Sequence, residues 1–352
     1  MQHVCIIPGD DAAPEAVLPS IDVLRALELD LEFNVLPGGA EGTEQYGRKE
    51  FARIAQEAID AADTTLYGST SGTSPGLGYL RWGKGTFANV RPIRYLPGAN
   101  SPLAQPEGID FIIVRENMED MYVGVEGDVE ALAPLNLVNR LTRKPIDTTN
   151  GRFAIKIITE ANSRRVLEFG FELARKRKAE GHPGKLTASC KHNMLPHTDG
   201  LFREVAYDVA RQNPDIEFDE YIVDDFARRI VAEPHQLDVV VLPNLYGDIL
   251  SDEASGLIGG LGLAPSACYS DDFAYFEPVH GTAPDIAGQH IINPTATLLS
   301  SAMMLDWLGH ADAAKRLEAA VEAVYREGVT LTPDQGGSAS SDEFCQAVAK
   351  HL

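Results

Sequence analysis

The sequence has few cysteines, no long apolar run and a shortage of positive charge. Its four cysteines are scattered and form no Cys-x-x-Cys pair, a pattern expected in a reducing compartment. No apolar run approaches the length of about 20 residues that a membrane-spanning helix needs. There are 30 Lys and Arg against 52 Asp and Glu, which gives a formal net charge of −22. This negative charge argues against nucleic acids and anionic membranes as partners.

The first residues lack the basic segment followed by an apolar one that marks a secretory signal. We therefore expect a cytoplasmic protein. A chain of 352 residues with 44% hydrophobic residues can bury a large core, and its length predicts two domains.

Strand-like and helix-like segments alternate along most of the chain, which indicates an α/β fold. The expected strands are 4–7, 31–36, 64–67, 111–114, 153–158, 185–189, 216–223 and 238–242. The expected helices are 14–29, 48–62, 160–180, 198–212, 248–259, 294–308, 311–327 and 341–350. Residues 125–152 are polar and irregular, and we expect them to form an arm or clasp.

Two carboxylates follow the buried strand expected at 238–242. Asp248 and Asp252 are four residues apart, so in a helix they lie on the same face about one turn apart. Two such carboxylates repel each other unless a cation lies between them. From this stretch alone, both a divalent cation site and a solvated polar face are possible.

Three arginines lie near strand ends or in loops of this acidic chain: Arg81, Arg91 and Arg115. Arg115 closes an apolar strand, where a side chain can project into a crevice at the strand's carboxyl end. Guanidinium groups bind carboxylates in a bidentate manner, so these residues suggest capture of an anion with several carboxylates. Surface ion pairs with Asp and Glu are the alternative for each one.

Three other patterns are weaker. Residues 78–85 resemble a phosphate-binding P-loop, but Gly85 replaces the Ser or Thr that would hold magnesium. Residues 83–88 match the dinucleotide-binding pattern only loosely, with no strand leading into them. Cys190, His192 and His197 could be zinc ligands, but no fourth ligand follows at a familiar spacing. We interpret Cys190, His192 and His197 as ordinary loop residues.

Several motifs follow one another in order along nearly the whole chain. They are Leu80-Arg81 with Ala88-Asn89-Val90-Arg91-Pro92, Val114-Arg115-Glu116-Asn117 with Tyr122, Lys191-His192-Asn193 before Asp199-Gly200-Leu201-Phe202, Val223-Asp224, Gly247-Asp248 with Asp252, and Glu277-Pro278-Val279-His280-Gly281 with Asp285, Gly288 and Asn293-Pro294. In their order and spacings these motifs resemble those of the β-decarboxylating dehydrogenases, the isocitrate and isopropylmalate dehydrogenase family.

The resemblance implies a two-domain α/β fold with a central mixed sheet flanked by helices, distinct from a classical Rossmann fold. A discontinuous large, cofactor-binding domain would comprise residues 1–97 and 255–352. The small domain, residues 98–254, would carry the clasp at about 125–152 and the dimer interface.

The resemblance also implies the substrate and its chemistry, an oxidative decarboxylation of a 3-substituted (2R)-malate. Arg81, Arg91 and Arg115 would bind its carboxylates. Lys191 would handle the proton of the C2 hydroxyl, and Tyr122 would protonate the enol carbon. Closure of the two domains over the substrate would then be expected.

Mg²⁺ or Mn²⁺ is implied as the metal, because oxygen ligands suit these ions. Asp248 and Asp252 would bind it together with Asp224 from a second subunit, and Lys191 would also come from that subunit. The active form would therefore be a homodimer with shared sites.

For the cofactor, the resemblance implies NAD. Asp285 would accept hydrogen bonds from the free ribose hydroxyls and repel the 2′-phosphate of NADP, whose users tend to carry Lys-Tyr at the positions of Asp285 and Ile286. Glu277, His280, Gly281 and Asn293 would also line the cofactor site.

The sequence departs from the family in two loops. The family usually has glycines where this chain has Asp11 and Ala13, so the backbone is less permissive there. Pro75 and Leu77 replace the Ser and Asn of isocitrate enzymes, which weakens isocitrate as the substrate. Leu77 resembles the apolar contact of isopropylmalate enzymes. Tyr79-Leu80-Arg81 resembles the homoisocitrate enzymes, and Leu96-Pro97-Gly98 with Ser101-Pro102-Leu103 resembles the tartrate and D-malate branch.

Two alternatives remain open. One is an NAD-dependent isocitrate dehydrogenase. The other is a non-catalytic regulatory subunit of a heteromeric dehydrogenase, which we would expect to lose one of Lys191, Tyr122, Asp248 or Asp252, although all four are present.

Overall fold

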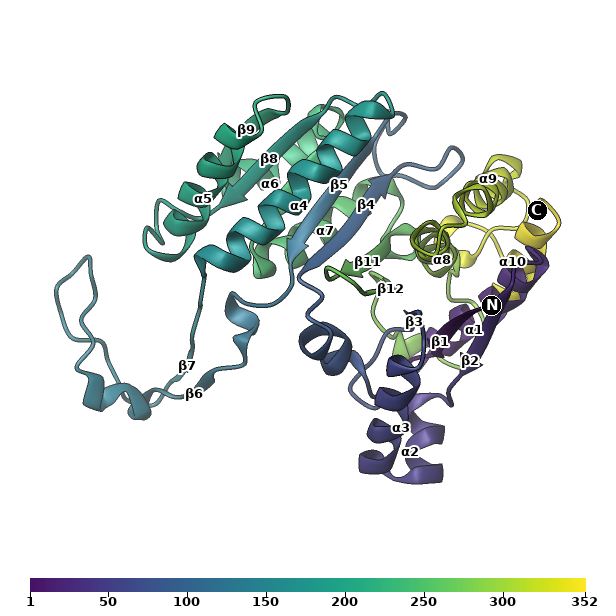
Figure 1. The fold of residues 1–352 in the computed structure, drawn as a ribbon, viewed down its shortest axis with the longest axis horizontal. Helices are drawn as coiled ribbons and strands as arrows, with labels where there is room; N and C mark the ends of the chain where they lie inside the picture. The colour runs from purple at the N-terminus through teal and green to yellow at the C-terminus, as the bar shows by residue number, and fades with distance from the viewer.

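A ten-stranded mixed sheet runs through the whole molecule in the computed structural model, which describes residues 1–352 (Figure 1). The strand order is β2-β1-β3-β12-β11-β4-β5-β10-β8-β9. The strands are β1 (Gln2–Ile7), β2 (Leu31–Val35), β3 (Thr64–Tyr67), β4 (Ala88–Arg94), β5 (Asp110–Glu116), β8 (Lys185–Cys190), β9 (Glu217–Ile222), β10 (Val239–Leu242), β11 (Pro265–Tyr269) and β12 (Ala274–Pro278). The predicted fold class, α/β with a mixed sheet flanked by helices, is confirmed.

The two ends of the sheet are parallel and its centre is antiparallel. β2, β1, β3 and β12 pair in parallel, as do β5, β10, β8 and β9. β11 pairs antiparallel with β12 and β4, and β4 pairs antiparallel with β5. Six adjacent strands thus come from residues 1–97 and 255–352, and the other four come from residues 98–254. The division into two domains stays a prediction.

Helices cover both faces of the sheet. They are α1 (Ala13–Ala26), α2 (Gly39–Tyr46), α3 (Arg48–Asp60), α4 (Glu160–Ala179), α5 (Thr198–Gln212), α6 (Val223–Ala232), α7 (Asn244–Ile258), α8 (Thr295–Trp307), α9 (Ala311–Glu327) and α10 (Ser341–Ala349). Side chains alternate along a strand, so Val114 of β5 packs in the cluster beneath α4 while Ile113 packs in the cluster that includes α7. No helix of the molecule is both long and apolar enough to cross a membrane.

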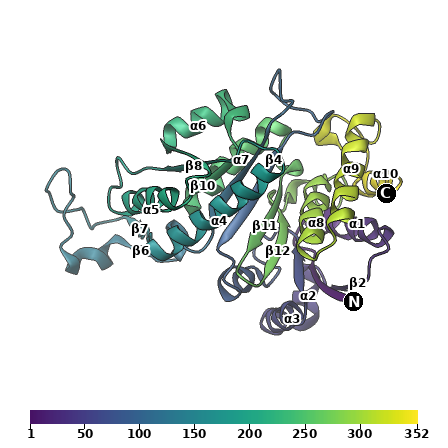
Figure 2. The same cartoon turned by 45° about the horizontal axis from the view of Figure 1, so that its top comes forward.

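An arm extends from the body between β5 and α4, and both views show it projecting away from the sheet (Figures 1 and 2). It contains the short antiparallel pair β6 (Glu126–Asp128) and β7 (Arg152–Ala154). Several large apolar side chains of the arm are exposed: Leu135, Leu137, Val138 and Leu141. The arm corresponds to the polar, irregular stretch expected at 125–152.

The structure differs from the sequence prediction in several elements. The helix expected at 248–259 begins four residues earlier, at Asn244. The strand expected at 153–158 is reduced to Arg152–Ala154 in the arm, and Val223 begins a helix instead of ending a strand. The sequence did not predict α2, α6, β4, β6, β11 or β12. β4, β11 and β12 each contain a proline, a residue that is depleted in strands because it has no backbone N–H for the ladder.

Candidate active site

Two of the predicted arginines lie side by side on the α7 face of the sheet. In the antiparallel pairing of β4 with β5, Arg115 is opposite Asn89, two residues before Arg91. Residues two apart in a strand share a face, so the guanidinium groups of Arg91 and Arg115 reach the same side. Nη1 of Arg91 donates to Oγ of Ser251 at 2.6 Å, and Nε of Arg115 donates to Oδ1 of Asn244 at 2.8 Å.

Asp248 is the centre of this cluster. Its Oδ1 accepts a hydrogen bond from Nη1 of Arg115 and lies 3.3 Å from Nη1 of Arg91. Its Oδ2 accepts the hydroxyl hydrogen of Tyr122 at 2.7 Å. The structure therefore brings together one acid, two cations and one phenol from four separate segments of the chain.

Burial and charge shift the ionisation of this cluster. Burial, reinforced by Arg91, lowers the pKa of Arg115 to about 10. Burial opposes ionisation of Asp248, but Arg115 and Arg91 outweigh it and lower the pKa of that carboxyl. Burial, and then the charge of Asp248, raise the pKa of Asp252, although Arg91 opposes the shift. Burial and the hydrogen bond to Asp248 raise the pKa of Tyr122.

The placement of Asp248 and Asp252 one turn apart in α7 tests whether a divalent cation fits here. The side chain of Asp252 is 51% exposed and lies on the same helix face as Asp248, with only Arg91 within ion-pair distance at 3.5 Å. Two carboxylates, one destabilised by the other, provide the hard oxygen ligands that Mg²⁺ and Mn²⁺ favour. These residues fit such an ion.

Arg81 and Leu77 lie in and just before the short helical turn Tyr79–Gly83. Nε of Arg81 is buried without a hydrogen-bond partner, and the charge of Arg81 contributes to lowering the pKa of Asp248. An anion held near Asp248 could accept that unused hydrogen. Leu77 is partly buried against the cluster that contains Tyr67 and Leu80.

Lys191 and Asp224 lie apart from the Asp248 cluster. Nζ of Lys191 contacts both carboxylate oxygens of Asp224, and this ion pair lowers the pKa of Asp224. Only one group of three His, Cys, Asp or Glu ligand atoms in the chain falls within 4.8 Å, and it contains neither Asp224 nor Asp248. A single chain thus does not assemble the three predicted metal ligands.

The turn that places Tyr122 is held in an unusual backbone conformation. Asp120 has φ 69° and ψ −134°, a region that few residues other than glycine adopt. Its carboxylate is buried, accepts the backbone N–H of Leu245 at 3.0 Å and pairs with Nζ of Lys156 at 3.1 Å. These contacts fix the turn against the first residues of α7.

The predicted cofactor residues lie at the end of β12 and in the loops after it. Nε2 of His280 is buried without a hydrogen-bond partner, while its Nδ1 lies 2.8 Å from the carbonyl oxygen of Gly281. Burial lowers the pKa of His280, which favours the neutral ring. A buried ring nitrogen without a partner is an atom that a bound nucleotide can satisfy. Glu277 is partly buried, and its charge favours the protonated form of Arg81.

Asp285 and Asn293 differ in how free their side chains are. Asp285 is exposed in the turn Pro284–Ile286, and its carboxylate makes no hydrogen bond or ion pair within the chain. Asn293 is buried, and its side-chain amide donates to Tyr325 at 3.1 Å and to Asp334 at 3.0 Å. Its Oδ1 accepts the backbone N–H of Thr295 at 3.0 Å. Asn293 therefore holds the loop in place.

The first loop adapts to its missing glycines. Asp11 adopts a φ of 52° at a position where the sequence comparison expected glycine. Ala12 donates its backbone N–H to the carbonyl of Thr282 at 3.0 Å, and Glu15 accepts the backbone N–H groups of Gly288 and His290. The loop is thus tied to the candidate cofactor region even though Asp11 replaces glycine.

Sequence reasoning missed two residues of the cluster. Ser251 accepts a hydrogen bond from Arg91, and Asn244 accepts one from Arg115 while donating to the carbonyl of Glu119 at 3.2 Å. Ser251 lies three residues after Asp248 in the helix, so helical spacing alone could have indicated it. Nothing in the local sequence pairs Asn244 with Arg115.

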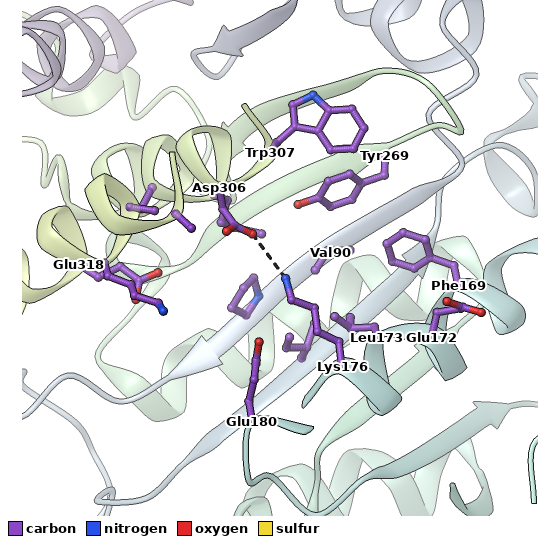
Figure 3. Close-up of a pocket in the computed structure, with 17 residues that line it drawn as sticks. Val90, Phe169, Glu172, Leu173, Lys176, Glu180, Tyr269, Asp306, Trp307 and Glu318 are labelled. Carbon is purple, nitrogen blue, oxygen red and sulfur yellow. Dashed lines mark hydrogen bonds and ion pairs between the residues drawn. The ribbon is translucent and has the colours of Figure 1, made fainter. Parts of the chain in front are cut away.

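A cavity of about 660 Å³ lies on the opposite face of the sheet (Figure 3). Its floor includes Val90 of β4, whose side chain alternates with that of Arg91. Lys176 of α4 and Asp306 of α8 approach across it to 3.5 Å (Figure 3). This cavity and the charged cluster around Asp248 therefore lie on opposite faces of the sheet.

Known proteins resemble the chain over its full length. Residues 3–348 match the family model described as isocitrate/isopropylmalate dehydrogenase. The 3-isopropylmalate/3-methylmalate dehydrogenase of Methanocaldococcus jannaschii is 40% identical, with 100% of this chain and 99% of that protein covered. The isocitrate/homoisocitrate dehydrogenase of Thermus thermophilus is also 40% identical, with 99% and 98% covered.

Among solved structures, the isocitrate dehydrogenase from Methylococcus capsulatus superposes with a TM-score of 0.84 and 33% identity. The alignment covers 100% of this chain and 99% of that one. These matches agree with the mixed sheet and with the resemblance found in the sequence. The chain belongs to the isocitrate/isopropylmalate dehydrogenase family.

Proposed function

We propose that the protein catalyses the NAD- and divalent-metal-dependent oxidative decarboxylation of a 3-substituted (2R)-malate. The observation that carries the proposal is the convergence of Arg91, Arg115 and Tyr122 on Asp248. The cluster combines anion-binding groups, a metal-binding carboxylate and a proton donor in one place. That combination is what a metal-assisted reaction of a dicarboxylic acid requires.

Asp248 and Asp252 of one subunit and Asp224 of its partner would hold Mg²⁺ or Mn²⁺. When bound, the ion would act as a Lewis acid that acidifies the C2 hydroxyl and stabilises the enolate oxygen. In the isolated chain, Arg91 and Arg115 neutralise Asp248. A bound metal ion would neutralise Asp248 in their place. The two arginines can then turn to the substrate's carboxylates.

The chain's own residues account for the proton movements. Arg81, Arg91 and Arg115 orient the substrate so that Lys191 of the partner takes the proton of the C2 hydroxyl. NAD, when bound, would supply the acceptor for the hydride of C2, and C2 becomes a ketone carbon. The C3 carboxylate then departs as CO₂, its bonding electrons form the enolate, and Tyr122 gives its proton to C3. The raised pKa of Tyr122 keeps the phenol protonated at neutral pH.

NAD is proposed as the cofactor on the strength of Asp285. Its exposed carboxylate makes no contact within the chain, so it can accept hydrogen bonds from ribose hydroxyls. Glu277, His280 and Gly281 would line the same site, with Nε2 of His280 as a free polar atom.

Sharing of the site implies a homodimer, because Lys191 and Asp224 do not reach Asp248 within one chain.

We also propose a cytoplasmic location. All four cysteines are free and buried, a state that a reducing compartment maintains.

A panel of substrates tests the proposal most directly. The purified chain is assayed for NADH production with Mn²⁺ and, in turn, D-malate, tartrate, isopropylmalate, homoisocitrate and isocitrate. We expect steady turnover with one of the first four and weak turnover with isocitrate, since Pro75 and Leu77 offer its extra carboxylate no polar partner. Isocitrate as the best substrate would establish the alternative dehydrogenase. No turnover with any of them would favour a regulatory subunit.

A further inference from the structure

Three side chains of different chemistry gather where β8 ends. Cys190 is the last residue of β8, His192 follows two residues later, and Glu220 lies on the neighbouring strand β9. One ligand atom from each falls within 4.8 Å of the other two. Sγ of Cys190 lies 4.0 Å from Nδ1 of His192, which lies 3.0 Å from Oε1 of Glu220. The third candidate ligand beside Cys190 and His192 is therefore Glu220, and not His197 as the sequence suggested.

Glu220 provides a buried carboxylate as a ligand. Its side chain is only 7% exposed, and its Oε2 accepts a hydrogen bond from Nε of Arg203 at 3.0 Å. Its Oε1 is buried and lies 3.0 Å from Nδ1 of His192. A buried carboxylate oxygen is costly unless another group or an ion binds it. This oxygen lies within 4.8 Å of the sulfur and of the ring nitrogen.

We propose that Cys190, His192 and Glu220 form a Zn²⁺ site, with a water molecule as the fourth ligand. One thiolate, one imidazole and one carboxylate make up a ligand set that zinc favours, whereas Mg²⁺ and Mn²⁺ prefer oxygen alone. The Cys190 thiol donates to the carbonyl of Asp199 at 3.3 Å. On binding, the thiol releases its proton to solvent and the sulfur bonds to zinc instead.

The position of the site gives zinc a regulatory effect, and this part of the inference rests on the proposed function. Lys191 lies between two of the ligands, and Asp224 follows the end of β9 by two residues. Zinc would therefore fix both segments that carry the Lys191–Asp224 ion pair. Lys191 must leave this pair to act at a neighbouring subunit's substrate. Zinc bound at the site would hinder that movement and so lower turnover.

Cobalt spectroscopy on the full-length protein tests the site without any need for turnover. Co²⁺ is added to metal-free protein in excess Mg²⁺, which occupies the Asp248 and Asp252 carboxylates. We expect a sulfur-to-cobalt charge-transfer band that Zn²⁺ abolishes. The band should disappear in Cys190→Ser and persist in Cys268→Ser, a matched change at another buried cysteine. A wild-type protein without the band, or a band that persists in Cys190→Ser, would overturn the site.

His192→Ala guards against misfolding of the cysteine variant, because His192 is only partly buried. We expect His192→Ala to weaken Zn²⁺ binding at least about tenfold, and His197→Ala to leave it unchanged. Equal Zn²⁺ affinity in these two variants would contradict the site. If the protein turns over a substrate, zinc in excess Mg²⁺ should slow the wild type but not His192→Ala. Equal slowing of both proteins would overturn the regulatory effect. A protein that shows the cobalt band but no turnover would disprove the proposed function alone.

Discussion

Tyr122 has the most specific chemical role in the proposed reaction. Its hydroxyl donates to Asp248, and its pKa is raised by burial and by that hydrogen bond. Both effects keep the proton on the phenol until a stronger base forms nearby. The enolate carbon of the proposed reaction is such a base.

Replacing Tyr122 separates the two halves of the reaction. Tyr122→Phe removes the proton donor but leaves the ring, so formation of the protonated product should slow by about 10²- to 10⁴-fold. Hydride transfer should slow far less. Single-turnover measurements of NADH and of the final ketone check this. Tyr207→Phe, on the surface helix α5, serves as the control, and equal slowing of both steps in Tyr122→Phe would count against Tyr122 as the acid.

We predict that Asp285 determines the preference between the two nicotinamide cofactors. The double change Asp285→Lys with Ile286→Tyr replaces a carboxylate that repels a 2′-phosphate with a cation that attracts it. The ratio of kcat/KM for NADP to that for NAD should rise at least about tenfold, equivalent to about 1.4 kcal/mol. Asp312→Lys makes the same charge change at an exposed position on α9 and should leave the ratio unchanged. Preference of the unmodified protein for NADP would refute the role of Asp285.

At the scale of single residues, the sequence predicts the charged groups better than their partners. Arg115 and Asp248 were predicted because a strand end and helical spacing limit where they lie. Arg91 lies within β4, which the sequence did not predict, and it was identified from the motif around it. Asn244 was missed because its contact with Arg115 joins positions 129 residues apart. Glu220 was missed for the same reason, since only the pairing of β9 with β8 brings it to Cys190.

At the scale of elements, α7 holds two carboxylates whose ionisation affects folding in opposite directions. The folded-state pKa of Asp248 is lowered, so its charge stabilises the fold above its unfolded pKa, and that contribution is lost as the pH falls through the folded value. The folded-state pKa of Asp252 is raised, so its ionisation destabilises the fold once the pH exceeds the unfolded value, and fully above the folded value.

Opposite stability changes are therefore expected from two similar variants. In metal-free protein at pH 7, Asp248→Asn should lower the free energy of unfolding and Asp252→Asn should raise it slightly. Both should weaken the rise in Tm that Mn²⁺ causes in the wild type. Denaturant titrations with and without Mn²⁺ check both statements. A shift of the same sign in the two metal-free variants would contradict the electrostatic account of α7.

The elements that the sequence predicted are those with a strong local pattern. The apolar strand β10 and the amphipathic helices α5 and α9 matched closely, because burial imposes periodicity on them. The antiparallel centre of the sheet was missed. β4 and β11 are stabilised by neighbours distant in sequence, and their prolines weaken the local strand signal.

At the scale of the molecule, the arm exposes apolar side chains to water, which is unfavourable for a monomer. Val138 and Leu141 are 54% and 67% exposed, and the proposed dimer would cover them. The double change Val138→Asp with Leu141→Asp should convert the dimer into monomers and abolish activity. Light scattering after size exclusion measures the mass. Val329→Asp, at an exposed position outside the arm, should leave the dimer intact.

An unchanged dimer in the arm variant would show that the contact lies elsewhere. Monomers that keep full activity would contradict the shared site itself. The two outcomes thus separate the location of the interface from its role in catalysis.

The central claim is that Lys191 of one subunit acts with Asp248 of the other, and mixing two inactive variants tests it most directly. Lys191→Met and Asp248→Asn are unfolded together and refolded at equal amounts. In a shared-site heterodimer one of the two sites receives neither change, so random pairing should restore about a quarter of wild-type activity. The control mixture of Lys191→Met with Asp224→Asn should stay inactive, because every site then carries a change. No recovery in the first mixture would contradict the shared site.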